Sequence, residues 1–294
     1  MCEFCLHNME NGEDVYNSLK GATFLIHLIS GSVAGMLEYS IFYPLDTVKT
    51  RMQDLTHANK SVFRTMVNMC QNEGPSSLFR GMTIFAGGSA PAHGMYFVAY
   101  EYFKVKMSSH FNKNIAYGLS GAIATTVHDG LMVPIEAIKQ RRQVEGSPYK
   151  SNIDCIVKMY KQEGIRSFYR SFTTQLLMNI PFQSVHFIVY EWASHALSPE
   201  EGFNPLSHAT AGAIAGALAA FITNPLDVSK TLLNTQKHEE KVVGVWNAMK
   251  KVYAVAGPSG YFRGATARIL HVMPATGICW GTYESMKYGL KRVL

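Results

Sequence analysis

Three side chains that can bind a transition metal occur in similar settings along this sequence. His93, Met178 and His271 each lie within three residues of a proline, inside a stretch without Asp, Glu, Lys or Arg. Imidazole nitrogen and thioether sulfur are ligands that suit first-row metals such as Fe²⁺. Ionisable side chains are costly in apolar surroundings, so histidines in such stretches favour a functional role. We therefore treat these three residues as candidate ligands of a metal that is bound transiently.

The settings are similar because the chain itself is a threefold repeat. A Pro-x-acid-x-x-Lys motif occurs three times, and a glycine, an arginine, a second proline and a Tyr-Glu pair follow each copy at nearly constant spacing. A fixed period of this kind indicates one structural unit used three times within a single domain. The motifs occupy 44–49, 134–139 and 225–230, and the expected parts are an N-terminal tail 1–20 and repeats 21–110, 111–201 and 202–294.

Six stretches lack charged residues, and each is near the length of about 20 residues that crosses a bilayer as a helix. Charged residues make up only 16% of the chain, against about 25% in soluble domains. This deficit argues against an ordinary soluble enzyme, and 12% aromatic residues exclude disorder. We predict an all-α membrane protein with six transmembrane helices, two in each repeat, joined within the repeat by a short amphipathic helix. The stretches are 21–37, 81–100, 114–128, 171–190, 202–226 and 269–283.

The formal net charge of +6 is concentrated in the three segments that join the two long helices of each repeat. They hold 19 of the 27 Lys and Arg residues. Basic loops mark the inner face of a membrane protein, which is the matrix side in an organelle. The same clustering accounts for the positive charge without a nucleic-acid partner. The segments are 45–80, 135–170 and 226–263.

Three copies of the motif in register resemble the mitochondrial carrier family, over nearly the whole chain. The resemblance implies a multi-pass transporter of the mitochondrial inner membrane whose cavity opens alternately to the two sides, with no enzyme activity. It also implies a charged gate at each end of the cavity. The matrix gate comprises the pairs Asp46–Lys139, Glu136–Lys230 and Asp227–Lys49, braced by Gln53 and Gln143, with the shorter Asn234 in the third brace position. The outer gate comprises Glu191 with Lys287, Glu284 with Lys104, the tyrosines Tyr100, Tyr190 and Tyr283, and Glu101, which meets Ser194 instead of a base.

Residues that differ among the repeats are those we expect to select the substrate, because the repeated residues serve the common mechanism. When the three repeats are aligned on their second prolines, two sets of equivalent but differing residues match the family's contact positions at mid-cavity. Arg268 is the single basic residue on the second helices of the repeats between the two gates, so the cavity lacks the cations that anionic substrates need. The candidate substrate-binding residues are Gly88, Ser89, His93, Met178, Asn179, Gln183 and His271, with Glu38, His128 and Asp129 on the first helices.

Within the family, several segments resemble the members that bring iron into the matrix: 91–97, 128–129, 171–187 and 224–236. Together with the imidazole, thioether, amide and carboxylate groups, this favours Fe²⁺ as the transported substrate, with no resident cofactor. An inside-negative membrane potential would draw a cation inward by about 2.3 kcal/mol per charge per 100 mV, doubled for a dication.

Two alternatives remain at this stage. The first is a carrier for a small organic solute resembling an amino acid, read by Asn179, Gln183, Glu38 and Asp129. The second is a protein that uses its basic loops to bind a membrane surface or nucleic acid, which the regular spacing of lysine with proline and acid disfavours.

Motifs of nucleotide-binding and hydrolytic enzymes do not occur. Cys2, Cys5 and His7 have metal-like spacing but are weak support for a site, and we expect a monomer in the lipid bilayer.

Overall fold

The computed structural model describes residues 42–54, 61–108, 112–197, 205–236 and 242–278, and this part of the chain contains helices and no strand. The expected first helix, 21–37, and the tail with Cys2, Cys5 and His7 lie outside the described residues. The helices are 42–53, α4 (Val62–Glu73), α5 (Met82–Ser108), α6 (Lys113–Gln143), α7 (Asn152–Glu163), α8 (Phe172–Leu197), α9 (Pro205–Ile222), α10 (Asn224–Thr235), α11 (Val245–Ala256) and 265–278.

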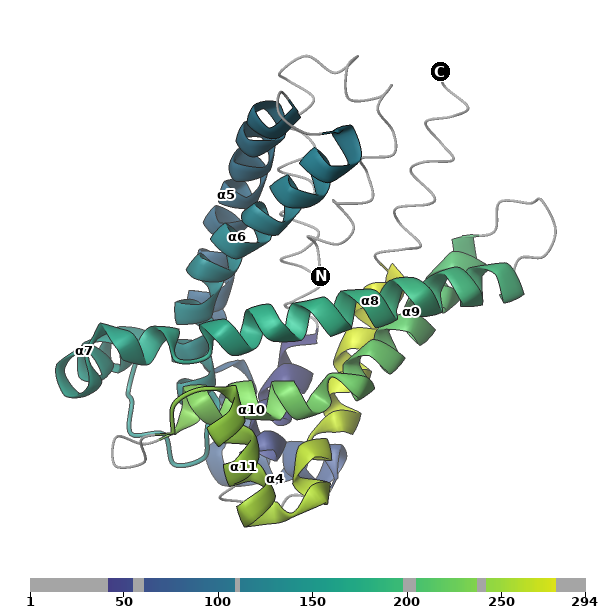
Figure 1. Ribbon diagram of the computed structural model, residues 1–294. Helices are drawn as coiled ribbons and strands as arrows, with labels where there is room; N and C mark the ends of the chain where they lie inside the picture. Colours follow the sequence, from purple (N-terminus) through teal and green to yellow (C-terminus); the bar gives the residue numbers. More distant parts are fainter. Residues whose placement is uncertain (1–41, 55–60, 109–111, 198–204, 237–241, 279–294) are drawn as a thin grey trace.

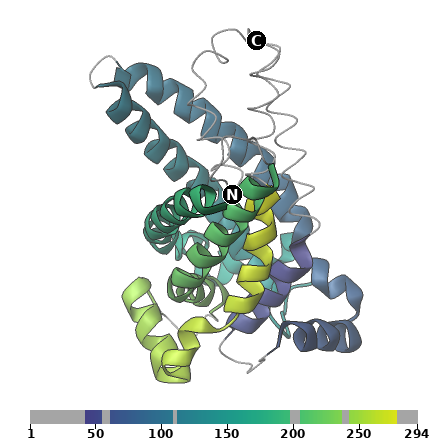
Figure 2. The same ribbon diagram turned by 90° about the vertical axis from the view of Figure 1, so that its right-hand side faces the viewer.

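The long helices coincide with the charge-poor stretches of the sequence. The stretches 81–100, 114–128 and 171–190 lie within or largely within α5, α6 and α8, and 202–226 covers α9 and the start of α10. Figures 1 and 2 show α5 packed side by side with α6, and α8 beside α9. Helices α4, α10 and α11 gather at the lower end of the view in Figure 1.

The repeated proline acts differently in the second and third repeats. Pro134 lies inside the unbroken α6, whereas Pro225 stands at the start of α10, after a break that bends the chain by 62° from α9. A proline lacks a backbone N–H and crowds the preceding turn, so it weakens a helix, which continues in α6 but breaks between α9 and α10. Among the described helices, none passes alone a length and hydropathy criterion for a membrane span, whereas Leu206–Ile222 and Asn224–Thr235 pass it as a bent pair.

A short helix follows the motif in every repeat and ends at the repeated glycine. Gly74, Gly164 and Gly257 cap α4, α7 and α11 with φ of 84°, 74° and 63°. Side chains with a Cβ rarely adopt a positive φ, which explains why glycine stands at this position in all three copies. A single 3₁₀ turn comes next each time: η2 (Pro75–Phe79), η3 (Ile165–Tyr169) and η4 (Pro258–Phe262).

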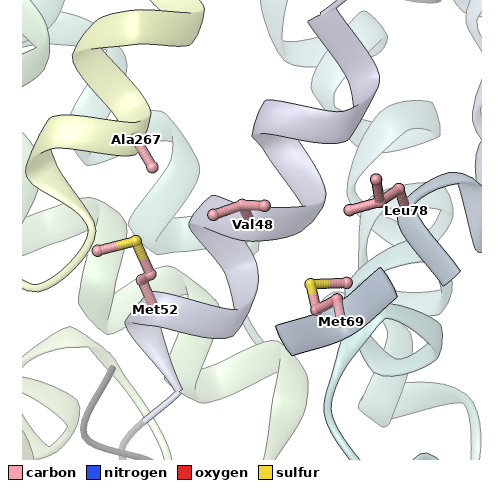
Figure 3. Packing of buried hydrophobic residues seen from close by; sticks show 5 residues of the cluster. All are labelled: Val48, Met52, Met69, Leu78 and Ala267. Atoms are coloured by element: carbon pink, nitrogen blue, oxygen red, sulfur yellow. The ribbon is translucent and has the colours of Figure 1, made fainter. Parts of the chain in front are cut away.

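Each short helix packs against the motif-bearing helix of its own repeat. In the first repeat, Met69 of α4 joins Val48, Met52, Leu78 and Ala267 in one apolar cluster (Figure 3). Equivalent clusters form around α7 and α11.

The opposite face of these short helices is apolar as well and points outward. Phe63, Ile153 and Trp246, one large apolar residue from each short helix, are more than 70% exposed. Large apolar side chains exposed on this face suit packing at the surface of a membrane.

Candidate functional site

The three motif-bearing helices, 42–53, α6 and α10, are joined to one another by three ion pairs. We call these pairs the ion-pair ring. In each motif the acid and the lysine are three residues apart, so they lie on one face of the helix, and each reaches a different neighbour. The resemblance in the sequence implied the same pairs. They are Asp46–Lys139 and Asp227–Lys49, each with 2.8 Å between nitrogen and oxygen, and Glu136–Lys230.

Two glutamines brace the ring through their side-chain amides. Gln53 donates to Asp227 Oδ2 at 2.7 Å and accepts from the hydroxyl of Thr231 at 2.6 Å. Gln143 donates to Asp46 Oδ2 at 3.2 Å. Both glutamines are fully buried, so the hydrogen bonds satisfy amides that would otherwise be costly to bury.

The third brace is different, because Asn234 is one methylene shorter than glutamine. Its amide donates to Gln140 Oε1 at 2.8 Å instead of to the carboxylate of Glu136. In the part of the chain that the structure describes, Glu136 therefore receives no amide hydrogen bond of the kind that Asp46 and Asp227 receive. The Glu136–Lys230 pair has the least support of the three.

The Asp46–Lys139 pair has additional support from two aromatic rings. The ammonium of Lys139 lies 4.0 Å from the centre of the Phe85 ring and 5.2 Å from that of Tyr43. The Tyr43 hydroxyl is held by a 2.8 Å hydrogen bond that it donates to the carbonyl of Arg80. Cation–π contacts at these distances stabilise a partly desolvated cation. Sequence reasoning missed this arrangement.

A second polar cluster lies between α5 and α6. The rings of His93 and His128 pack edge to face, with centres 4.9 Å apart. His93 Nδ1 is 2.6 Å from the carbonyl oxygen of Ser89, and because a carbonyl only accepts, this nitrogen carries the proton. In the neutral ring the lone pair is then on Nε2, which is the form of histidine that binds metals.

The cluster continues to α8 through Asp129. His128 Nδ1 lies 3.6 Å from Asp129 Oδ1, and the amide of Asn179 donates to Asp129 Oδ2 at 2.7 Å. His128 and Asp129 are buried. Four of the candidate residues, from three helices, thus form one continuous polar group: His93, His128, Asp129 and Asn179.

The other two candidate metal ligands have separate surroundings. Met178 Sδ lies 3.7 Å from a guanidinium nitrogen of Arg268, and the ring of His271 packs edge to face on Phe42 at 6.4 Å. Among the described residues, no group of three or more His, Cys, Asp or Glu side chains is arranged to hold a metal ion. The described contacts do not bring His93, Met178 and His271 together.

The remaining candidates on the second helices have varied settings. A Cβ added to Gly88 would lie 2.2 Å from Ile135 Cδ1, so glycine permits the close packing of α5 on α6 there. Ser89 donates to the carbonyl of Ala86 in its own helix. The buried Oε1 atom of Gln183 accepts no hydrogen bond from the described residues.

The expected outer gate is described only in part. Of its residues, Tyr283, Glu284 and Lys287, and the side chain of Glu101, lie outside the described residues, as does the substrate-binding candidate Glu38. The described partner of Glu191 is His195, at 3.1 Å on the same exposed face of α8. Tyr190 bonds to His208 at 3.0 Å, and Lys104 lies over the rings of Tyr100 and Tyr117.

Three motif-bearing helices joined by a ring of ion pairs fit a solute carrier, and the comparisons with known proteins agree. The model of the family described as "Mitochondrial carrier protein" matches residues 20–111, 112–201 and 201–293. The chain belongs to the mitochondrial carrier family and is a transporter, not an enzyme.

Among its relatives are proteins named mitoferrin. The chain is 43% identical to human Mitoferrin-1 over 95% of its own length and 88% of that protein. It is 42% identical to human Mitoferrin-2, over 95% of this chain and 81% of the relative. With Mitoferrin of Caenorhabditis briggsae the identity is 39%, over 95% and 96% of the two chains.

Proposed function

We propose that this carrier moves Fe²⁺ across the mitochondrial inner membrane into the matrix by alternating access. The observation that carries the proposal is the contact of His93 with His128 across α5 and α6, in a chain 43% identical to a protein named Mitoferrin-1. Two imidazoles, one of which faces the carboxylate of Asp129, suit a first-row dication.

The ion-pair ring supplies the gate. With its three pairs formed, the motif-bearing helices are joined at one end, which we assign to the matrix side. Transport requires these pairs to break in the other state while pairs at the outer gate form. The outer gate comprises Glu101, Glu191, Glu284, Lys104 and Lys287 with their neighbouring tyrosines.

The metal contacts are proposed to be successive and weak. His93, Met178 and His271 have separate surroundings, and a closed four-ligand site would trap the metal instead of passing it on. Separate single contacts fit a metal that moves between ligands as the cavity changes shape. The protein needs no resident cofactor for this, and we propose that it works as a monomer in the bilayer, with its six helices spanning the membrane and its basic loops in the matrix.

Uptake by purified protein in liposomes tests the proposal. Fe²⁺ is supplied under reducing conditions with a chelating dye trapped inside, and Mn²⁺, Zn²⁺ and ATP are tested beside it. Saturable Fe²⁺ entry should fall at least about ten-fold in His93→Ala and Met178→Ala. Met95→Ala, on an exposed part of α5, is the matched control and should transport normally. Normal uptake by Met178→Ala would show that Met178 is not a contact.

A second candidate is a small organic solute that carries an amino group. The carboxylate of Asp129 and the Oε1 atom of Gln183, which accepts no hydrogen bond from the described residues, could both receive hydrogen bonds from such a group. Folded protein that admits no metal but exchanges a labelled amino acid would favour this candidate.

A further inference from the structure

Arg268 breaks the threefold symmetry at a position between the candidate site and the ion-pair ring. It lies six residues before Pro274, where the other two repeats have Phe85 and Gln175. Its side chain is buried in helix 265–278. A buried guanidinium is costly unless it is paired, so its contacts define what it does.

The guanidinium contacts three groups, which lie on α8, on α10 and at the break between α9 and α10. It donates to Thr223 Oγ1 at 2.9 Å, lies 3.7 Å from Met178 Sδ and has its Nε 3.6 Å from Asp227 Oδ2. Met178 is a proposed contact for the metal, and Asp227 belongs to the ion-pair ring. One side chain therefore touches both the site and the gate.

At Asp227 the arginine shares an oxygen with the gate lysine. Lys49 Nζ lies 2.8 Å from the same Oδ2 atom. Lys49 comes from the first repeat, whereas Arg268 comes from the same repeat as Asp227. A closer approach of Arg268 would strengthen a contact within the third repeat and weaken the one that holds the third repeat to the first.

At Met178 the arginine faces the sulfur atom that a metal would bind. A thioether sulfur that faces a guanidinium cannot bind a cation at the same time, because the two positive charges repel at this distance. Metal binding at Met178 therefore requires Arg268 to move. The carboxylate of Asp227, 3.6 Å from its Nε, attracts the guanidinium in that direction.

We propose that Arg268 is a positioning residue that couples metal binding at Met178 to the opening of the ion-pair ring. This inference rests on the proposed function, because it takes Met178 as a metal contact. The metal displaces the guanidinium toward Asp227, where it competes with Lys49 and releases the pair between the third and first repeats. A coupling of this kind is an energetic link between two sites through one element with two positions.

The test is the concentration dependence of Fe²⁺ uptake in liposomes for Arg268→Gln. Without the guanidinium the metal meets no repulsion at Met178, so KM should fall by about five-fold. Binding no longer weakens the Asp227–Lys49 pair, so the maximal rate should fall by a similar factor. Arg166→Gln, which removes an exposed arginine from η3, is the matched control and should leave both values unchanged.

Two further variants keep the test decisive. Arg268→Lys restores the charge, so its KM should return to within about two-fold of the wild type. In the double variant Met178→Ala/Arg268→Gln, the loss of arginine should no longer lower KM. A lower maximal rate at unchanged KM in Arg268→Gln, or unchanged values of both, overturns the inference. Normal uptake by Met178→Ala shows that Met178 is not a contact and also overturns the inference. Wild-type protein without Fe²⁺ uptake overturns the proposed function instead.

Discussion

Arg51 donates a 2.5 Å hydrogen bond from its Nε to the backbone carbonyl of Gln143, and so ties the first repeat to the end of α6 in the second. Arg141 makes the equivalent bond, of 2.8 Å, to the carbonyl of Asn234 in the third repeat. The third repeat has Leu232 at this position, and leucine has no side-chain donor that could make the equivalent hydrogen bond to the first repeat. Two of the three seams between repeats therefore have an arginine tether, and the seam from the third repeat to the first does not.

An acid is lost together with the arginine. Glu73 holds Arg51 through two hydrogen bonds, of 2.5 and 2.9 Å, and Glu163 holds Arg141 in the same way. The third repeat has Ala256 where the others have glutamate. Because both members of the pair are absent, no buried charge is left without a partner. The untethered seam is also the one at which Arg268 faces Asp227.

Glu73→Gln should lower the thermal stability at neutral pH but not at acid pH. The hydrogen bond from Arg51 is the largest cause holding the pKa of Glu73 below its ordinary value of 4.5. A lowered folded-state pKa contributes stability that is complete above the unfolded value and lost as pH falls through the folded value. The difference in melting temperature between wild type and variant should therefore shrink below about pH 4.5. A difference that stays constant down to pH 3 contradicts this account. Glu145 is an exposed acid 3.9 Å from Arg51, so the control variant Glu145→Gln should differ little from the wild type at any pH.

Lys139→Ala should abolish transport of every substrate, because it breaks the best supported pair of the ring. The variant removes the contacts with Asp46, Phe85 and Tyr43 together. We expect at least about a ten-fold loss in liposome uptake, because Asp46 loses the lysine that holds it to the second repeat. Lys158→Ala, which removes a half-exposed lysine paired with Asp154 in α7, should transport normally. Selective loss of Fe²⁺ uptake alone would assign Lys139 to the substrate instead of the gate.

Asn234→Gln should strengthen the ring and slow transport. The longer side chain can reach Glu136 as Gln53 and Gln143 reach their own carboxylates, and a hydrogen bond to a charged group contributes about 1.5–3 kcal/mol. We expect a higher melting temperature and a maximal uptake rate reduced by a few-fold. The reverse change, Gln143→Asn, should have the opposite effect on stability. Unchanged melting in both variants would mean that the amide braces carry little of the gate's stability.

Gly88→Ala should destabilise the packing of α5 on α6. The new methyl group would overlap Ile135 Cδ1 at 2.2 Å, and overpacking of this kind costs about 1–3 kcal/mol. Gly87→Ala is the matched control, because nothing lies within 4 Å of a Cβ there. Combining Gly88→Ala with Ile135→Ala should restore the melting temperature. A stable Gly88→Ala protein with impaired Fe²⁺ uptake would instead support a substrate contact at this position.

The sequence by itself determined the all-α repeat architecture. A motif that recurs three times in register specifies one local structure three times, and charge-free stretches of this length indicate long helices. The glycines that cap α4, α7 and α11 occupy positive φ, a backbone requirement that is local and therefore visible in the spacing. The repeated motif also carried the resemblance to the family, and that resemblance implied the pairing of the ring lysines with acids of neighbouring repeats.

The tertiary structure alone decided which unrepeated residues meet. The contact of His93 with His128, the aromatic rings around Lys139 and the position of Arg268 between Met178 and Asp227 all join residues that are 35 to 96 positions apart. Such contacts depend on how helices approach and on the reach of each side chain, and no local pattern encodes them. Asn234 illustrates the limit: its identity suggested a shorter brace, but only the packing of α10 against α6 directs its amide to Gln140.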